Sequence, residues 1–336
     1  MMPPVSPPLS TLRPLALGEI IDRAASFWRQ HLKPLFLLSL GFNLAVYCLT
    51  KVLQPFAQRA RVALTGGSDL ETQVASSVQF LLVSGAATFL SLWLYYLNTV
   101  AVARYVVPTQ LGETVTPAQA LGRAGQRVGA LTAAYVLSLL WGAAILFLMM
   151  LPGVLVSVVG TVLSAMRASD PEGRRLGLLV MGGGVVVLGV GLLGGLLWYL
   201  LRFCLLAPVL AMEDLSGLRS FRRAGELLSG RVGPGLTGRV SVRAMLIVTV
   251  VSIVLLAVGL LCGLPALLLQ FAYGNPFDRS APPPEIPLAF LVPAELLQVF
   301  GQAVFGPLGL VVYAMLYLDM RVRREGLDLE HDLASR

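Results

Sequence analysis

Long apolar runs alternate along the chain with shorter segments in which charged and apolar residues are mixed. Six runs carry no charged residue: residues 34–50, the stretch between Glu71 and Arg104, and residues 128–166, 176–201, 244–273 and 296–318. A helix needs about 20 predominantly apolar residues to cross the hydrocarbon core of a bilayer. The pattern therefore predicts an all-α fold, a polytopic membrane helix bundle with six transmembrane helices.

A proline stands near or beyond the end of the first span in each of three pairs. Pro55, Pro152 and Pro265 follow the last basic residue before the span by 22 to 25 residues. Because proline lacks an amide hydrogen and clashes with the preceding turn, we expect each of these spans to end at its proline. On this basis the third run, too long for one crossing and too short for two, is a crossing that ends at Pro152 and a short helix beyond it.

A mixed segment precedes each of these three spans, and its apolar residues recur at helical intervals. In residues 17–33 the leucine, isoleucine and tryptophan side chains fall on one side of a helix, and charged or amide side chains fall on the other. Helices of this kind lie along a membrane interface or cover the cytoplasmic mouth of a bundle. We expect their N-caps at Asp22, at Thr116 before Pro117, and at Ser216.

The three mixed segments share residues at matching positions. Residues 211–232 repeat a stretch 100 positions earlier, in which Glu113 corresponds to Glu213 and the Arg-Ala-Gly triplet at 123–125 to that at 223–225. A weaker copy contains Glu19, which is followed ten residues later by Arg29. The chain is therefore predicted to consist of three repeats of an amphipathic surface helix plus two spans, at about residues 15–105, 112–203 and 212–322. A disordered proline-rich tail at 1–14 and a cytoplasmic tail at 323–336 flank them.

Composition supports a membrane protein and limits its partners. Charged residues make up 13% of the chain and hydrophobic residues 56%, with a mean hydropathy of +0.79, whereas a soluble domain has about 25% and 45–50%. The net charge is +7, but the arginines flank apolar runs and form no basic domain face. We therefore expect anionic membrane lipids and no nucleic acid as partners.

Positive charge is unequal on the two sides of the six spans. With the N-terminus in the cytoplasm, 18 of the 25 Lys and Arg residues fall on the cytoplasmic side. Short loops rich in Lys and Arg stay on that side of a membrane. We therefore predict a multi-pass protein of the cell inner (cytoplasmic) membrane, with both termini and all three amphipathic helices in the cytoplasm.

The fourth run is rich in glycine between Gly182 and Gly195. Small residues let helix backbones approach closely in a membrane, so we expect this span to be the most tightly packed. The triplet Gly182-Gly183-Gly184 lies inside the run and is interpreted as helix packing, not as a phosphate-binding loop.

The residues that nucleophilic and metal chemistry require are scarce. The chain has two histidines, His31 in an amphipathic segment and His331 in the tail, and neither has a partner at ligand spacing. No Gly-rich loop precedes a basic residue and Ser or Thr in the P-loop pattern. The sequence therefore predicts no enzyme, no metal site and no cofactor.

Ionisable residues near membrane depth are the remaining candidates, because each is costly there unless it is paired or faces water. Arg202, Asp319 and Arg321 stand at the ends of spans. They either mark the cytoplasmic edge, with Asp319 paired to a neighbouring arginine, or form a polar site where the three repeats meet. The full set of candidate lipid or structural polar sites is Glu19, Arg29, Glu113, Arg123, Arg202, Glu213, Arg219, Arg222, Arg223, Asp319 and Arg321.

The repeated glutamates are interpreted as structural clamps. Each stands three residues before an expected N-cap and ten residues before an arginine. A pair within one helix is excluded, since ten residues exceed the reach of i to i+4 contacts. We therefore expect Glu19, Glu113 and Glu213 to bond their own helix starts or an arginine of another repeat.

Several short motifs resemble a known family. They are LRPLALGEIIDRA at residues 12–24, Ala207-Pro208 with Glu213 and SFRRA at 220–224, and LYLDMRVRREGLD at 316–328. In this order they are similar to motifs of the glycerophosphoryl diester phosphodiesterase membrane-domain family of bacterial integral membrane proteins. The resemblance covers roughly residues 12–330 and implies an all-helical membrane domain of poorly defined function. Some members carry a fused catalytic domain, for which this chain has neither the room nor the His and carboxylate set.

Two functions are compatible with these features. The first is a non-enzymatic membrane protein that acts on lipids or on a membrane protein partner, with basic helices that hold anionic headgroups. The second is a carrier or channel for a small or amphipathic solute, formed where the repeats pack. Few charges inside the spans argue against ion coupling, and an intramembrane enzyme would lack a nucleophile with its base.

Overall fold

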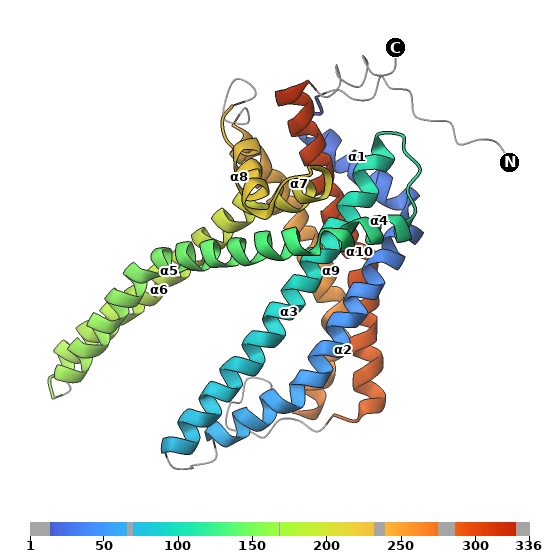
Figure 1. Ribbon diagram of the computed structural model, residues 1–336. Helices are drawn as coiled ribbons and strands as arrows, with labels where there is room; N and C mark the ends of the chain where they lie inside the picture. The colour runs from blue at the N-terminus through green and yellow to red at the C-terminus, as the bar shows by residue number, and fades with distance from the viewer. Residues whose placement is uncertain (1–13, 66–69, 168, 232–238, 275–285, 327–336) are drawn as a thin grey trace.

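The computed structural model describes residues 14–65, 70–167, 169–231, 239–274 and 286–326. These residues form ten α-helices, and their only β-pairing is an isolated bridge between Arg231 and Arg239 (Figure 1). The helices are α1 (Leu17–Gln30), α2 (Leu32–Thr65), α3 (Leu70–Gln110), α4 (Pro117–Gln126), α5 (Val128–Met166), α6 (Pro171–Phe203), α7 (Leu206–Met212), α8 (Gly217–Leu227), α9 (Val240–Tyr273) and α10 (Leu288–Glu325).

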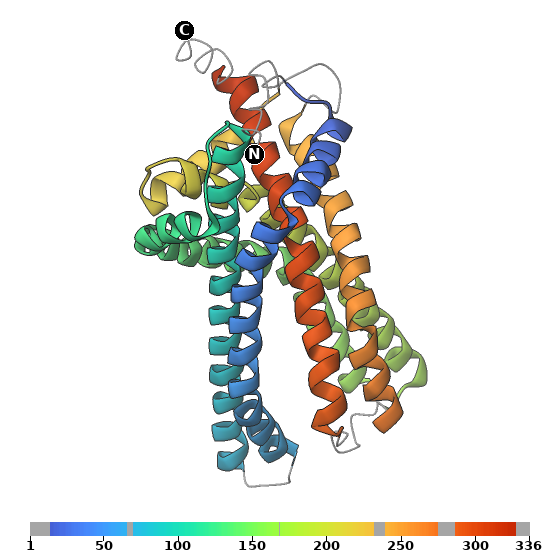
Figure 2. The ribbon, with the colours of Figure 1, turned by 90° about the vertical axis from the view of Figure 1, so that its right-hand side faces the viewer.

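The order of one short helix and two long ones occurs three times along the described chain. α1 precedes α2 and α3, α4 precedes α5 and α6, and α8 precedes α9 and α10, while the short α7 lies between α6 and α8. The two long helices of each set pack against each other as a hairpin, and the three hairpins diverge from a layer of short helices (Figures 1 and 2). The threefold sequence repeat itself stays a prediction.

All six long helices are long and apolar enough to cross a membrane. In five of them only 6–17% of the most apolar window is buried, against 56% in α10. Side chains that are both apolar and outward-facing over such lengths require a hydrocarbon environment. The protein is therefore a multi-pass membrane protein, the expected all-α architecture with six spans is confirmed, and α10 is its most enclosed span.

The prolines lie inside the long helices. Pro55, Pro152 and Pro265 occupy interior positions of α2, α5 and α9, which continue to Thr65, Met166 and Tyr273. The helix of each first span therefore continues past its proline, and the separate short helix that was expected after Pro152 is absent from α5. The point at which each span leaves the membrane stays a prediction. A proline removes one helical hydrogen bond, but leaving the helix inside hydrocarbon would leave several backbone groups unpaired.

Glycines hold α5 and α6 close together. On α6, Gly177, Gly184 and Gly191 recur every seven residues, and a Cβ at each would overlap the backbone of α5. The expectation of close packing for this span is met at these positions, although α6 is buried only along the strip that faces α5. Gly182 and Gly183 face open space, so only Gly184 of that triplet serves packing.

The protein's core lies where the short helices meet the ends of the hairpins. Six residues of α7, from Leu206 to Ala211, are buried, and this helix contacts α3, α8 and α10. Its sequence LAPVLAM is apolar on every side, as a helix enclosed by others requires. Fully buried side chains of α10, among them Leu316 and Met320, complete this core.

The starts of the short helices follow the predictions in two of three cases. Thr116 caps α4 by accepting a hydrogen bond from the amide of Gln119 at 3.3 Å, and Ser216 occupies the N-cap of α8 without a side-chain bond. The first helix begins earlier than expected, because its N-cap is Ala16 and not Asp22. The helical apolar pattern already starts at residue 17, and this pattern determines where α1 begins.

The structure tests the two predicted tails, at residues 1–14 and 323–336, only in part. Residues 1–13 of the predicted disordered tail lie outside the described residues. At the other end α10 continues to Glu325, three residues into the expected cytoplasmic tail, and Gly326 ends it with a left-handed φ of 64°.

Candidate functional site

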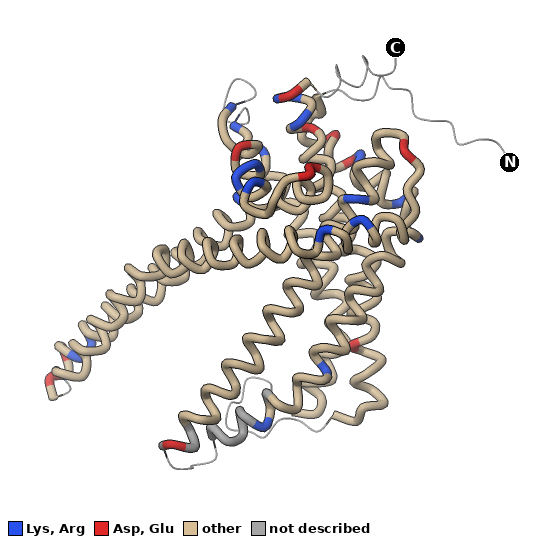
Figure 3. Tube along the Cα trace, viewed as in Figure 1, with Lys and Arg blue, Asp and Glu red and all other residues tan. Residues whose placement is uncertain are grey.

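Charged residues gather in the layer of short helices, and a smaller number lie toward the far tips of the hairpins (Figure 3). Two groups of ion pairs organise this layer. The first, the Glu213 network, consists of Arg127, Glu213, Asp214, Arg223, Tyr317, Arg321 and Glu325. The second, the Asp319 cluster, consists of Leu15, Arg243, Asp319 and Arg323.

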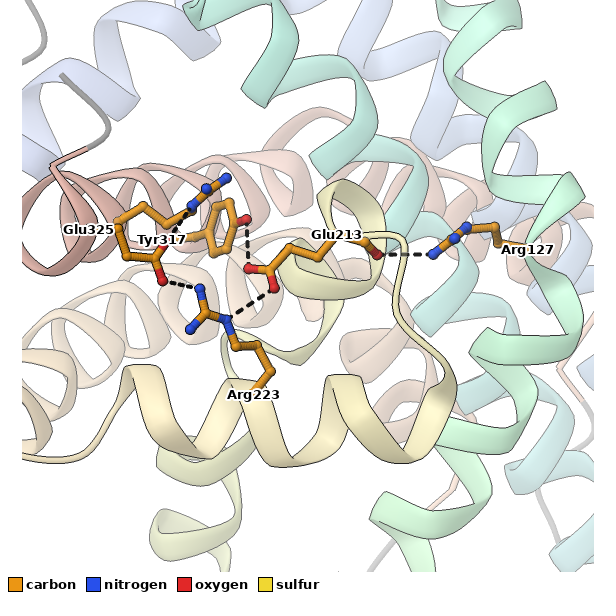
Figure 4. A network of polar contacts seen from close by, with 6 residues as sticks. Arg127, Glu213, Arg223, Tyr317 and Glu325 are labelled. Atoms are coloured by element: carbon orange, nitrogen blue, oxygen red, sulfur yellow. Dashed lines mark hydrogen bonds and ion pairs between the residues drawn. The ribbon is translucent and has the colours of Figure 1, made fainter. Parts of the chain in front are cut away.

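Glu213 lies at the turn between α7 and α8, where it forms the C-cap of α7. Its carboxylate accepts a hydrogen bond from Nε of Arg223 at 3.0 Å and one from the hydroxyl of Tyr317 at 3.2 Å (Figure 4). The carboxylate side chain is 16% exposed. This one side chain therefore joins α7, α8 and α10.

The exclusion of a pair between Glu213 and Arg223 is wrong. The ten-residue spacing was counted as if both residues belonged to one helix, but Glu213 precedes α8 and the chain turns between them. The turn brings the carboxylate back beside Arg223, about two turns into α8. The expectation for Glu19 is confirmed in its first form, because its carboxylate accepts from the amide of Ala16 at 2.7 Å at the start of α1.

Arg223 extends the Glu213 network to the C-terminal end of α10. Its guanidinium also pairs with Glu325, which pairs in turn with Arg321 at 2.8 Å one helical turn earlier (Figure 4). Burial alone would lower the pKa of Arg223, but hydrogen bonds and charge from Glu325 and Glu213 outweigh it and raise the pKa. Arg223 is therefore a permanent cation held between two carboxylates.

Arg127 secures the same turn from the junction of α4 and α5. It donates to the backbone carbonyl of Glu213 at 2.9 Å and pairs with Asp214 at 2.6 Å. Asp214 is largely exposed, so most of the benefit of Arg127 comes from satisfying the carbonyl at the helix end. The Glu213 network thus connects the middle and last thirds of the chain.

The Asp319 cluster is the more deeply buried group. The side chain of Asp319 is fully buried and pairs with Arg243 of α9 at 3.2 Å and with Arg323 at 3.1 Å. It also accepts from the amide of Leu15 at 2.8 Å, while Arg243 and Arg323 donate to the carbonyl of Leu15. The expectation that Asp319 pairs with a neighbouring arginine is confirmed, and the pair holds the segment before α1.

The other predicted site residues are dispersed over the layer. Arg202 donates to the carbonyl of Gly225 at 3.4 Å, which connects the end of α6 to α8. Glu113 is exposed in the turn before α4 and has no ion pair within the described part of the chain. The exposed arginines of the set are Arg29, Arg123, Arg219 and Arg222.

Sequence reasoning missed seven participants of the two groups. They are Leu15, Arg127, Asp214, Arg243, Tyr317, Arg323 and Glu325. The signal for Arg243 was present, because it opens the fifth span at the same membrane edge where Asp319 closes the sixth. Arg323 and Glu325 were assigned to a tail, although they continue the helical register of Asp319 and Arg321 at four-residue spacing. Arg127 carried no signal, since its main partner is a backbone carbonyl.

A further polar contact lies toward the opposite ends of the spans. Lys51 of α2 pairs with Glu295 of α10 at 2.6 Å, and the hydroxyl of Tyr47 donates to the second carboxylate oxygen at 3.0 Å. The pair joins two spans that are 244 residues apart in sequence. Ion pairs at this depth lower the cost of each charge and fix the two helices against each other.

A cavity of about 220 Å³ lies among α2, α3, α9 and α10. Polar groups from three of these helices reach its wall: Asn43, Asn98 and Gln302. The hydroxyl of Ser39 donates to the side-chain oxygen of Asn98 at 3.3 Å, which fixes one of these amides. Among the residues that the structure describes, no group of three or more His, Cys, Asp and Glu side chains converges in a way that could hold a metal ion.

No family model, no curated protein and no solved structure matches this chain. The family resemblance of the motifs at residues 12–24, 220–224 and 316–328 therefore stays a prediction.

Proposed function

We propose that the protein is a non-enzymatic integral membrane protein of the cytoplasmic membrane whose basic surface helices hold anionic lipid headgroups. In this proposal both termini and the layer of short helices lie in the cytoplasm, as the distribution of 18 of the 25 basic residues favours. Membership of the glycerophosphoryl diester phosphodiesterase membrane-domain family belongs to the same proposal.

The observation that carries this proposal is the outward face of α8. One side of the helix is buried, while Arg219 and Arg222 are exposed together with Leu218, which is 62% exposed. An apolar side chain beside two cations is the arrangement that binds the boundary between headgroups and acyl chains. α4 repeats it more weakly, with Arg123 and Leu121 exposed.

The test replaces Arg219 and Arg222 together by Gln. Each basic residue near an anionic surface contributes about 1 kcal/mol, so phosphatidylglycerol retention should weaken by roughly 2 kcal/mol, or about 30-fold. Native mass spectrometry of the full-length protein in mild detergent measures the retained lipid. Arg223 stays unchanged, because its replacement would also break the Glu213 network.

Arg174 and Arg175, replaced together by Gln, provide the matched control. These exposed residues at the tip of the α5–α6 hairpin carry the same charge but lie at the opposite end of the spans. We expect their replacement to leave lipid retention on the cytoplasmic face unchanged. Equal retention in the Arg219→Gln/Arg222→Gln variant and in the wild type would remove the lipid role from α8.

The cavity among α2, α3, α9 and α10 favours a second candidate function, a carrier for a small or amphipathic solute. Cys262 lines this cavity together with the three amides. In a variant with Cys48→Ser and Cys204→Ser, a carrier should let a membrane-impermeant thiol reagent reach Cys262 from each side in turn. Protection of Cys262 from both sides would contradict the carrier.

A further inference from the structure

A hollow of about 480 Å³ lies between the C-terminal parts of α8 and α10. Four arginines and a single carboxylate dominate its lining, which consists of Arg223, Leu227, Gly230, Arg231, Arg323, Arg324 and Glu325. We call this hollow the arginine pocket. Its volume falls within the range of about 300–1,000 Å³ that is usual for small-ligand sites.

Positive charge in the arginine pocket exceeds the negative charge that faces it. Glu325 is divided between Arg223 and Arg321, and Asp319 is divided between Arg323 and Arg243. Each of these two carboxylates therefore serves two guanidinium groups. Because Glu213 also pairs with Arg223, the unbalanced charge comes from the arginines without an ion pair among the described residues, and Arg324 is one of them. Arg231 adds a further cation, which is exposed and has no ion pair among the described residues. The surplus makes the pocket attractive to an anion.

Guanidinium donors remain unused on two arginines of the lining. Arg324 donates from Nη1 to the carbonyl of Glu226 at 2.5 Å and makes no ion pair within the described ranges. Arg231 makes no side-chain hydrogen bond with the residues that the structure describes. Guanidinium groups present their donors as a planar fork, which matches two oxygens of one phosphate.

Gly230 keeps the space beside Arg324 open. Its φ of 88° is left-handed, and a Cβ at this position would lie 3.1 Å from Nη2 of Arg324. A side chain would therefore strain the backbone and press on the guanidinium. Because glycine has no side chain, the backbone at Gly230 can lie close to the guanidinium of Arg324.

We propose that the arginine pocket binds a phosphate group with two negative charges, carried either by a soluble phosphate compound or by the phosphomonoester headgroup of a lipid. The phosphate oxygens accept hydrogen bonds from Arg231 and Arg324 and lie within the field of Arg323. Because α8 and α10 line the pocket together, the bound anion links the last surface helix to the most enclosed span.

The arginine pocket is separate from the outward face of α8. Arg219 and Arg222 line a different hollow together with Leu218, and Arg223 borders both. Loss of phosphate binding in the arginine pocket and loss of lipid at the outward face are therefore distinguishable outcomes.

The test titrates the full-length protein in neutral detergent with pyrophosphate, with chloride at equal ionic strength as the control for screening. We expect saturable binding by isothermal titration calorimetry and a higher midpoint of thermal unfolding. Arg231→Gln and Arg324→Gln should each weaken the affinity about tenfold or more, since each removes a charge-assisted bond. Arg219→Gln/Arg222→Gln should bind pyrophosphate like the wild type.

A second arm distinguishes the two sources of phosphate. Nanodiscs of phosphatidylcholine with phosphatidic acid should stabilise the protein beyond nanodiscs without it if the anion is a lipid headgroup, whereas strong pyrophosphate binding in detergent indicates a soluble compound. Either result supports the proposal when Arg231→Gln/Arg324→Gln removes it. Binding of neither probe, or binding that these changes leave intact, overturns it. Arg231→Gln alone serves if the double variant does not fold, because the side chain of Arg231 has no polar partner among the described residues to lose.

Discussion

Glu213 makes three connections from one position in the turn between α7 and α8. Its carboxylate meets Arg223 and Tyr317, and its carbonyl meets Arg127. A buried ion pair is stable only when the attraction between its charges offsets the hydration that both have lost. Removing the charge of Glu213 leaves its partners partly buried without that attraction. The largest effect should fall on Arg223, which would then depend on Glu325 alone.

Glu213→Gln should destabilise the detergent-solubilised protein by roughly 1–3 kcal/mol, the range for a charge-assisted hydrogen bond. Thermal unfolding measures the loss. Glu113→Gln is the matched control, because Glu113 occupies the corresponding sequence position but is exposed and has no ion pair among the described residues. It should unfold like the wild type.

Wild-type stability in Glu213→Gln combined with lost function in cells would contradict the clamp and make Glu213 a site residue. A double-mutant cycle with Arg223→Gln gives a further check. The two changes should be less than additive, since each removes the same contact.

His31 lies between α1 and α2, and we expect it to make the stability of the folded protein depend on pH. Burial lowers the pKa of His31 from its ordinary value of 6.5, its ring stacks on Phe27, and Nδ1 lies 2.9 Å from the hydroxyl of Tyr105. Below pH 6.5 the unfolded chain takes up a proton that the folded protein resists, so this contribution to stability is lost as pH falls toward the folded-state pKa. The unfolding midpoint of His31→Gln should therefore fall less than that of the wild type between pH 7.5 and about 5.5. Parallel pH profiles for the two proteins would contradict this.

At the residue scale, sequence reasoning could identify Asp319 as a paired carboxylate, because a charge in an apolar run needs a partner wherever the neighbouring chain lies. It could not identify the partner of Glu213. That required the exact residue at which α7 ends, because the four residues between α7 and α8 decide which side chains can meet. Backbone contacts such as Arg127 to the Glu213 carbonyl depend on geometry alone and leave no residue pattern.

At the scale of elements, the α5–α6 hairpin depends on glycines at seven-residue spacing. Gly184→Ala should destabilise the hairpin by about 1–3 kcal/mol, the usual cost of overpacking, because the added Cβ would overlap the backbone of Ser157. Gly183→Ala is the matched control, since a Cβ there meets nothing within 4 Å. Thermal unfolding compares the two. Equal unfolding midpoints for the two variants would show that α5 and α6 can move apart without a loss of stability, and would contradict this prediction.

The lengths of the apolar runs predicted the six long helices correctly. They did not predict the residues at which these helices end. A run of apolar residues reports where hydrocarbon can surround the chain, but the helix continues wherever backbone hydrogen bonds would otherwise remain unmade. This is why α5 and α9 continue beyond Pro152 and Pro265 into apolar sequence. The short helices were easier to place, since two of the three have Thr or Ser at the expected N-cap.

At the scale of the whole molecule, the charges define two sides and make the orientation testable. Reporter fusions after Gly125 and Gly230 should read cytoplasmic, and a fusion at Gly173 should read extracytoplasmic, because Gly173 lies at the far end of the α5–α6 hairpin. Gly67 and Pro282, for which an extracytoplasmic signal is also expected, and Arg336, expected to be cytoplasmic, lie outside the described residues. A cytoplasmic signal at Gly173 would overturn the six-span topology.

The length of α5 sets how its hairpin can sit in a bilayer. Its 39 residues span about 58 Å at 1.5 Å per residue, nearly twice a hydrocarbon core of about 30 Å. Kept wholly in hydrocarbon, a helix of this length must lie about 60° from the membrane normal, or the bilayer around it must thicken. The wide divergence of this hairpin from the other two in Figure 1 is the arrangement that such a tilt requires.

The hold on Leu15 has a consequence for how the protein is made. The amide and carbonyl of Leu15 bind Asp319, Arg243 and Arg323, and the contact to Asp319 spans 304 positions. At about 5–20 residues per second, the last of these partners appears roughly 15–60 s after Leu15. During that interval the segment before α1 lacks its partners on α10. We therefore expect the segment before α1 to reach its final position only after α10 has been synthesised and inserted. If synthesis stops before α10, that segment should stay unattached.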